Sequence, residues 1–265
     1  MSNSRKLIIE ELENKLFDID KWPHYQLMFE HLDTIINQIS SNEKSAMIER
    51  CYIYGGQSIF SSLFDKKKLD IFDFVPPNSN IENRKNYQKN KLEILPLTSQ
   101  KIRKANIEIN TLTLFNSLAL NAPYDYIFIP NVLHHHPNPF NLFDNCKNVL
   151  KDKGYLYIFD AILRENHQKP DDFIRFTPDG ISHALKENGF DVSQIYTSKS
   201  PLEALTYTID QVIQYDLPVE LIEEINKLSI FIKRKFKSVL NKNYSNLTRK
   251  YTSFPVAYSV LAQKI

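Results

Sequence analysis

Three consecutive histidines, His134 to His136, follow an apolar run at 124–130 and are the first candidates for chemistry in this sequence. The run predicts a strand buried on both faces, which places the histidines just beyond its end. An imidazole pKa near ~6.5 lets a histidine take a proton from a hydroxyl at neutral pH, so His134 and His135 are candidate general bases. The alternative is that each histidine starts a helix and packs against the sheet. No metal site is predicted, because consecutive side chains point in different directions and no other ligand has metal-like spacing.

A second polar group follows the apolar run at 155–162 and contains Asp160, Arg164 and Arg175. Two arginines suit a phosphate or carboxylate on a substrate, and a solvated loop is the alternative. Near the N-terminus, Trp22 and Tyr25 are candidates to line the pocket for that substrate, or to pack within a lid over it.

The helices and strands that would position these candidates can be predicted from the hydrophobic periodicity of the chain. Helical spacing predicts helices at 7–16, 28–39, 58–64, 139–150, 177–188, 202–215 and 218–241. Short apolar runs predict strands at 51–54, 69–75, 92–97, 107–114, 124–130, 155–162, 190–196 and 254–263. Strands that alternate with helices imply a largely parallel sheet covered on both faces, with ligands at the carboxyl ends of its strands.

A series of short motifs marks the second half of the chain. The strand that begins Tyr124-Asp125 leads into Val132-Leu133-His134-His135, a helix then ends in Leu150-Lys151-Asp152-Lys153-Gly154, and a later one ends in Gly189-Phe190. In this order the motifs resemble the second half of the class I S-adenosylmethionine-dependent methyltransferases. The resemblance covers about residues 50–199 and 254–265.

The resemblance implies an α/β fold: a Rossmann-like, seven-stranded, mostly parallel sheet with helices on both faces and an antiparallel last strand. Residues 1–48 would form an N-terminal helical lid, and residues 49–265 a methyltransferase-like domain with a helical insertion at about 202–245. It also implies methyl transfer from S-adenosyl-L-methionine, with S-adenosyl-L-homocysteine as product, to a small-molecule acceptor with an oxygen nucleophile. A catalytically inactive binding or partner subunit is the alternative.

Cofactor-binding residues follow from the same resemblance. The family has an acid-x-Gly-x-Gly-x-Gly loop after its first strand, and the match here is Tyr54-Gly55-Gly56, without the acid and the later glycines. A carboxylate at the end of the second strand accepts hydrogen bonds from the ribose hydroxyls, and Asp73 is the match, with Asp70 as an alternative. Asn110 after the third strand is the candidate for the adenine. Asn131 and Val132 after the fourth are candidates to face the cofactor.

Composition narrows the remaining classes. A formal net charge of +2 does not favour a nucleic-acid partner. No apolar run reaches membrane-spanning length and no signal-peptide pattern is present, so a cytoplasmic protein without a membrane partner is expected. Cys51 and Cys146 are expected to be reduced and buried. Assembly with identical chains is left open.

Overall fold

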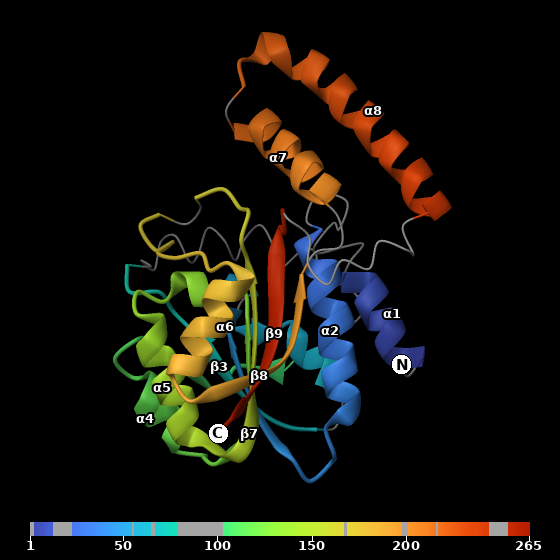
Figure 1. Ribbon diagram of the computed structural model, residues 1–265. Helices are drawn as coiled ribbons and strands as arrows, with labels where there is room; N and C mark the ends of the chain where they lie inside the picture. Colours follow the sequence, from blue (N-terminus) through green and yellow to red (C-terminus); the bar gives the residue numbers. More distant parts are fainter. Residues whose placement is uncertain are drawn as a thin grey trace.

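Seven strands form the central sheet of this computed structural model, which describes residues 3–12, 23–54, 56–64, 67–78, 103–166, 169–197, 201–215, 217–243 and 254–265 (Figure 1). Their spatial order is β5-β3-β1-β6-β7-β9-β8. The strands are β1 (Lys44–Glu49), β3 (Lys68–Phe74), β5 (Ile107–Ile109), β6 (Tyr124–Pro130), β7 (Leu150–Ala161), β8 (Phe190–Thr197) and β9 (Ala257–Lys264). A separate two-stranded sheet pairs β2 (Gln57–Ser58) with β4 (Arg103–Lys104).

The direction of the strands confirms the expected fold class. Strands β5, β3, β1, β6 and β7 pair in parallel, whereas β9 lies antiparallel between β7 and β8. The order reverses between β1 and β6, so the carboxyl ends of these two strands flank the switch point at which such sheets bind ligands.

Side chains of opposite parity fill two cores, one on each face of the sheet. In β6, Phe128 contributes to one core, while Ile127 and Ile129 contribute to the other. The first core is completed by α1 (Asn3–Glu11), α2 (His24–Gln38) and the 3-10 helices η2 (Cys51–Tyr54) and η3 (Phe60–Phe64). The second is completed by α4 (Leu114–Ala119), α5 (Pro139–Val149) and α6 (Pro178–Glu187). Helix α2 therefore covers a face of the sheet as well as reaching its carboxyl edge.

Two helices between β8 and β9 form a hairpin that stands above the carboxyl edge of the sheet: α7 (Pro201–Tyr215) and α8 (Val219–Asn243) (Figure 1). They match the helices predicted at 202–215 and 218–241. In the described part of the chain, no helix combines the length and the apolar character needed to cross a membrane.

The predicted strand at 51–54 is wrong. The first strand of the sheet is Lys44–Glu49, and Cys51–Tyr54 forms η2. The central part of β1 is apolar, but Lys44 and Glu49 at its ends weaken the pattern, whereas the four residues of η2 are all apolar or aromatic. Strand β1 begins before residue 49, so a division of the chain at 48/49 separates most of the central strand from its sheet.

Two further elements differ from expectation. The segment 58–64 contributes the end of β2 and the 3-10 helix η3 rather than an α-helix. The strand expected at 107–114 ends at Ile109, because Asn110 starts a turn into α4. The strand expected at 92–97 lies outside the described residues.

Candidate functional site

The carboxyl end of β1 carries Glu49, an acid that the sequence motif seemed to lack. Its side chain is buried; Oε2 accepts a hydrogen bond from the Ser58 hydroxyl at 2.5 Å, and Oε1 accepts one from the Ile59 amide at 3.0 Å. Burial, with a smaller contribution from the like charge of Asp73, raises the pKa of Glu49 to about 8. Glu49 forms no ion pair with any of the described residues.

Asp73 lies beside Glu49, because parallel β1 and β3 place these two residues opposite each other. It is also buried, and its Oδ1 accepts a hydrogen bond from the Tyr52 amide at 3.0 Å. Two buried carboxylates therefore end neighbouring strands. Asp70, the alternative to Asp73, lies near the other end of β3 and bonds Tyr124 and Lys44.

With β1 in place, the loop aligns differently from the sequence-based match. The acid is Glu49, and Cys51, Ile53 and Gly55 fall at the three glycine positions of the family pattern. All four side chains of η2 are buried, including that of Tyr54, whose pKa burial raises. The sequence-based match Tyr54-Gly55-Gly56 assumed a strand that ends at residue 54, whereas the strand ends at Glu49.

The remaining loop residues divide into three cases. Gly55 lies outside the described residues. Gly56 has a φ of +81°, and a Cβ at this position would meet no atom within 4 Å, so the turn needs glycine for its backbone angle and not for a close approach. Gln57 pairs with Lys104 in the small sheet, while Ile59 is completely buried.

On the other side of the switch point, Asn131 follows β6 in a left-handed conformation, with a φ of 56°. Its backbone amide donates to the Phe159 carbonyl at 2.8 Å, and its side-chain amide donates to the Tyr25 hydroxyl at 3.2 Å. The strand end is thereby tied to the start of α2. Val132 is buried next to it. Asn110 lies apart from this group: it is exposed, and its side chain accepts hydrogen bonds from the Leu112 and Thr113 amides.

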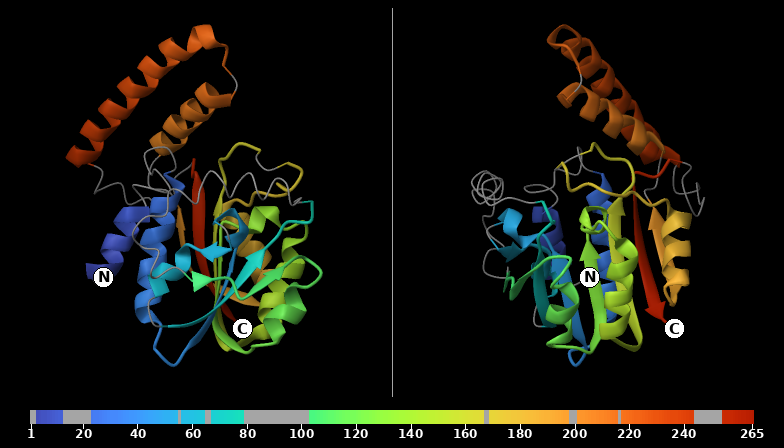
Figure 2. Two further views of the ribbon diagram at one scale, coloured as in Figure 1. Left: turned by 180° about the vertical axis from the view of Figure 1, so that it is seen from behind. Right: turned by 90° about the vertical axis from the view of Figure 1, so that its left-hand side faces the viewer.

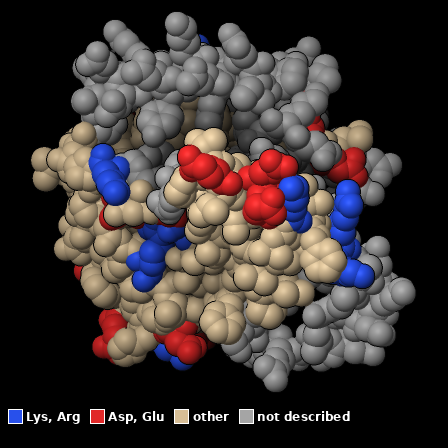
Figure 3. Space-filling view, turned by 90° about the horizontal axis from the view of Figure 1, so that it is seen from above, with Lys and Arg blue, Asp and Glu red and all other residues tan. Residues whose placement is uncertain are grey.

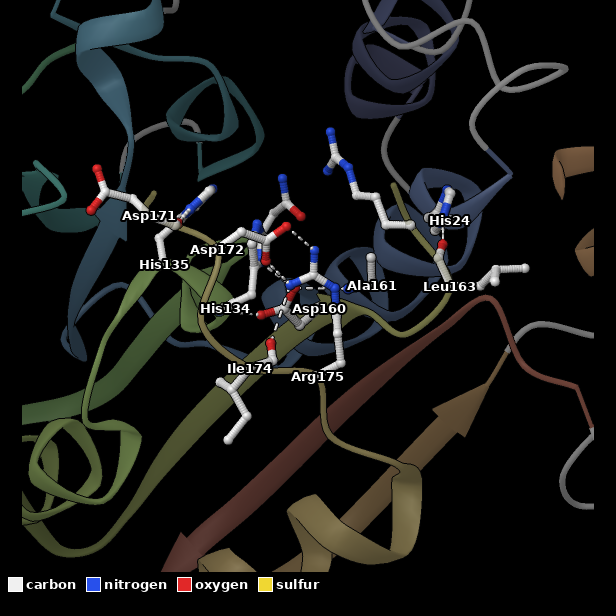
Figure 4. A network of polar contacts seen from close by, with 12 residues as sticks. His24, His134, His135, Asp160, Ala161, Leu163, Asp171, Asp172, Ile174 and Arg175 are labelled. Atoms are coloured by element: carbon white, nitrogen blue, oxygen red, sulfur yellow. Dashed lines mark hydrogen bonds and ion pairs between the residues drawn. The ribbon is translucent and has the colours of Figure 1, made fainter. Parts of the chain in front are cut away.

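His134 and Asp160 form a buried pair at the ends of β6 and β7 (Figure 4). His134 Nδ1 lies 2.6 Å from Asp160 Oδ1, and the His134 amide donates to Oδ2 at 2.8 Å. Burial raises the pKa of Asp160 to about 6, although nearby Arg175 and Arg164 lower it. The His134 ring has no exposed surface, so this geometry suits a residue that holds the two strand ends together.

The other two histidines have separate partners. His135 Nδ1 bonds the Asp171 carbonyl, and His136 Nδ1 accepts from the Asn138 amide at 3.1 Å. The His136 ring stacks on Phe74, and burial lowers its pKa to about 4. The described residues contain no cluster of three or more His, Cys, Asp or Glu side chains suited to a metal.

The two predicted substrate arginines differ in what surrounds them. Arg175 forms a two-pronged ion pair with Asp172, which Figure 4 shows beside Asp160, and it also donates to the Ile174 carbonyl. The guanidinium group of Arg175 is therefore engaged by residues of its own loop. Arg164 is instead largely buried, with 12% of its side chain exposed, and contacts Tyr25 and Glu165.

His24, at the start of α2, contacts the residues that follow β7. Its Nε2 lies 3.0 Å from the Leu163 carbonyl, and its ring meets that of Tyr207 edge-on at 4.6 Å. The Tyr207 hydroxyl donates to Glu165 at 2.6 Å. Tyr25 in α2 and Asp160 and Arg164 at the end of β7 thus lie at one end of the sheet, whereas Trp22 lies outside the described residues.

The fold is that of the class I methyltransferases. No protein-family model matches this sequence, and no curated protein is significantly similar to it. Solved structures with a similar fold include the O-methyltransferase of a trans-AT polyketide synthase multienzyme from Brevibacillus brevis in complex with S-adenosyl-L-homocysteine. That structure has 17% identity, covers 100% of this chain and 80% of its own, and gives a TM-score of 0.46.

Two others have different activities. The [4+2]-cyclase SpnF has 11% identity over 89% of this chain and 80% of its own, with a TM-score of 0.43. Phosphoethanolamine N-methyltransferase 2 of Haemonchus contortus, in complex with S-adenosyl-L-methionine, has 12% identity over 88% of this chain and 52% of its own, with a TM-score of 0.43. At these identities the likeness concerns the fold alone, which the strand order establishes independently.

The two acids provide a test of whether S-adenosylmethionine fits this edge. The cofactor carries an ammonium group and two ribose hydroxyls, and the buried pair of Glu49 and Asp73 offers negative charge and acceptors for both. Glu49 accepts from the Ser58 hydroxyl and the Ile59 and Phe60 amides, which is fewer than the roughly four hydrogen bonds that a carboxylate can accept. The acids therefore fit the cofactor. The side chains of Cys51 and Ile53 occupy glycine positions and narrow the approach to the loop backbone.

Proposed function

We propose that this chain binds S-adenosyl-L-methionine at the carboxyl ends of β1 and β3 and transfers its methyl group to a small-molecule acceptor. The observation that carries the proposal is the buried neighbouring pair Glu49 and Asp73, placed at the strand ends of a sheet with the methyltransferase order. Burial makes both acids costly to ionise, and Glu49 forms no ion pair with a described residue. A cationic ligand reduces that cost.

Within this proposal each residue has a defined task. Asp73 accepts hydrogen bonds from the ribose hydroxyls, Glu49 faces the ammonium group, and Asn131 with Val132 forms the wall on the β6 side. When bound, the sulfonium supplies the methyl group and leaves as S-adenosyl-L-homocysteine. The main contribution of the chain is alignment of the acceptor, which can provide roughly 7–11 kcal/mol.

The acceptor side is the ring of polar residues around Arg164 and Tyr25. Arg164 gives this side a positive charge that suits a phosphate or carboxylate on the acceptor. We propose an oxygen nucleophile. A role for His134 or His135 as its base requires a movement that exposes the ring, because both are fully buried here.

A second candidate is a methyltransferase-like binding or partner subunit without the reaction. The side chains of Cys51 and Ile53 favour it, since they stand where the family has glycines and are buried within η2. This candidate predicts a closed loop that S-adenosyl-L-homocysteine does not open.

Titration calorimetry of the full chain with S-adenosyl-L-homocysteine separates the two candidates. The proposal expects binding, and it expects Asp73→Asn to weaken binding by about tenfold or more, because a hydrogen bond to a charged group is worth roughly 1.5–3 kcal/mol. The matched control is Asp70→Asn, the same change on the same strand at a carboxylate bonded to Tyr124, and it should leave affinity unchanged.

A further variant identifies the cause of a negative result. If the natural chain gives no heat at millimolar ligand and Ile53→Gly binds, the loop side chain has closed a competent site, and the second candidate is correct. If neither binds, methyl transfer at this edge is wrong.

A further inference from the structure

We propose that Ser58 is a positioning residue: its hydroxyl orients Glu49 and stabilises the ionised form of this acid, which is the form that attracts an ammonium group. This role rests on the proposed function, because it names the group that prepares Glu49 for the cofactor. Three observations carry it: the donors at Glu49, the contacts that fix Ser58, and the charge of the surface seen from above.

The donors at Glu49 come from one short segment, residues 58–60. The Ser58 hydroxyl donates to Oε2 at 2.5 Å, the Ile59 amide donates to Oε1 at 3.0 Å, and the Phe60 amide adds a third hydrogen bond. Each donor stabilises the carboxylate and opposes the burial that raises the pKa of Glu49 to about 8. Of these three donors, the Ser58 hydroxyl is a side-chain group, so a substitution can remove it.

The single hydrogen of the Ser58 hydroxyl is committed to Glu49. The hydroxyl oxygen accepts a hydrogen bond from the Ser61 amide at 3.2 Å, and its hydrogen is donated to the carboxylate. A hydroxyl can donate only once, so the bond to Glu49 uses this capacity fully. Ser58 has no exposed surface, and therefore bulk water does not compete for the hydrogen.

The small two-stranded sheet sets the position of Ser58. Ser58 is the last residue of β2 and pairs with Arg103 of β4; the short arrows of the two strands lie side by side in the left view of Figure 2. The Ser61 hydroxyl connects the strands, since it donates to the Ser58 carbonyl at 2.6 Å and accepts from the Arg103 amide at 2.9 Å. The Ala105 amide also donates to the Gly56 carbonyl at 2.8 Å. These bonds fix the backbone that carries the hydroxyl.

The surface seen from above does not replace the buried acids. Its described part carries acidic and basic side chains together, so it presents no uniform negative charge to a cationic ligand (Figure 3). Recognition of an ammonium group therefore depends on the buried Glu49 and Asp73. The like charge of Asp73 raises the pKa of Glu49, whereas the Ser58 hydroxyl lowers it. Ser58 thus favours the state in which Glu49 is ionised beside Asp73.

Titration calorimetry with S-adenosyl-L-homocysteine tests this role across pH. Ser58→Ala should weaken binding by about tenfold at pH 6.5, because a hydrogen bond to a charged group is lost. The loss should shrink to about threefold at pH 8.5, where more of Glu49 is ionised in both chains. Cys51 and Tyr54 also interact with Glu49, but burial raises the pKa of the thiol and of the phenol, so neither titrates in this range. A loss of equal size at every pH overturns the role.

The matched control is Ser62→Ala. Ser62 is as buried as Ser58, but its hydroxyl donates to the Ile59 carbonyl at 2.7 Å and not to Glu49. Its loss removes no hydrogen bond to a charged group, so Kd should change by less than about threefold at every pH. Equal losses of affinity in Ser58→Ala and Ser62→Ala overturn the proposal.

Two further variants cover the case in which Ser58→Ala does not fold, which circular dichroism detects. Ser58→Thr keeps the hydroxyl and should bind within about threefold of the natural chain, because the donor to Glu49 remains. Ser61→Ala loosens β2 from β4 and should weaken binding in the same direction as Ser58→Ala, with the same decrease of the loss towards pH 8.5. A Ser61→Ala chain with unchanged affinity overturns the positioning by the small sheet.

Carbon-13 NMR of the Glu49 carboxyl distinguishes a failure of this role from a failure of the proposed function. In a ligand-free chain labelled at glutamate, with Glu49→Gln to assign the signal, Ser58→Ala should raise the pKa of Glu49 by roughly one pH unit. A natural chain that does not bind S-adenosyl-L-homocysteine contradicts the proposed function, while a raised pKa in Ser58→Ala still supports the action of Ser58 on Glu49. An unchanged pKa overturns that action whether or not the cofactor binds.

Discussion

The two sides of the switch point each bury an acid at a strand end, and they neutralise it in different ways. Glu49, at the end of β1, accepts hydrogen bonds from a hydroxyl and an amide, and its nearest charged neighbour is another acid, Asp73. Asp160, at the end of β7, accepts from two amides and lies beside His134, with Arg175 and Arg164 nearby. Both are fully buried, yet the pKa is about 8 for Glu49 and about 6 for Asp160.

This difference shows which side already contains the positively charged neighbours that a buried acid requires. The β7 side has its own cations and a histidine, so it forms a self-contained structural unit. On the β1 side, Glu49 forms no ion pair with a described residue, and its raised pKa favours the protonated acid, so a cation supplied by a ligand would do most to stabilise its ionised form. The predictions below test this contrast, beginning with the largest effect.

The largest effect is expected on the β7 side. Asp160→Ala leaves the His134 and Ala161 amides and the His134 ring without their acceptor, and should reduce the free energy of unfolding by roughly 4 kcal/mol, as for other broken buried pairs. Urea unfolding measures it. The control is Asp152→Ala on the same strand, whose side chain is exposed and whose loss should cost less than about 0.5 kcal/mol. A small loss at Asp160 would mean that the β7 side is not self-contained.

Glu49→Gln tests the β1 side through pH. The folded-state pKa of Glu49, about 8, is raised above its usual 4.5, so its stabilising contribution is complete below about pH 4.5 and is lost as pH rises through 8. The free energy of unfolding of the Gln variant should therefore rise relative to the natural chain between pH 5 and pH 8, by roughly 3 kcal/mol.

Urea titrations at pH 5, 6.5 and 8 measure this difference. Glu187→Gln, on the exposed surface of α6, is the control and should show no such trend. Saturating S-adenosyl-L-homocysteine should shrink the Glu49 effect, because an ammonium group favours the ionised acid. An unchanged difference with bound ligand would separate Glu49 from the ligand.

His136 gives an opposite pH dependence near the β6 end. Its folded-state pKa, about 4, lies below its usual 6.5, so the fold favours the neutral ring and loses stability as pH falls from 6.5 towards 4. Between pH 6.5 and pH 5 the natural chain should lose about 2 kcal/mol relative to His136→Asn, which keeps an acceptor but does not titrate. His183→Asn, at an exposed position on α6, is the control. Parallel pH curves for the natural chain and His136→Asn would contradict the assignment.

The smallest effect is expected when one glycine in each half of the chain is replaced by alanine. Gly56→Ala and Gly189→Ala both place a side chain at a φ near +80° and should each cost about 1 kcal/mol. Thermal unfolding measures both. Because Gly56 has open space around its Cβ position, its variant should bind S-adenosyl-L-homocysteine as the natural chain does. A tenfold loss of affinity would place the ligand against Gly56.

Long apolar runs made the second half of the fold predictable. The strands predicted at 124–130 and 155–162 match β6 and the second part of β7, because a strand buried on both faces is almost continuously apolar. The strand predicted at 190–196 matches β8, an edge strand that is only partly buried. Strand β1 was missed because Lys44 and Glu49 are charged and Cys51–Tyr54 is the more apolar run. An acid directly after Ala46-Met47-Ile48 was the signal that would have identified Glu49 as the strand-end acid.

The sequence by itself determined the alternation of strands and helices and the two apolar faces, since those depend on the local period of hydrophobic residues. Only the tertiary structure decided that Glu49 lies beside Asp73 and that Asp160 lies beside His134. Both pairs join residues far apart in the chain, and strand register, which the local sequence does not encode, brings them together.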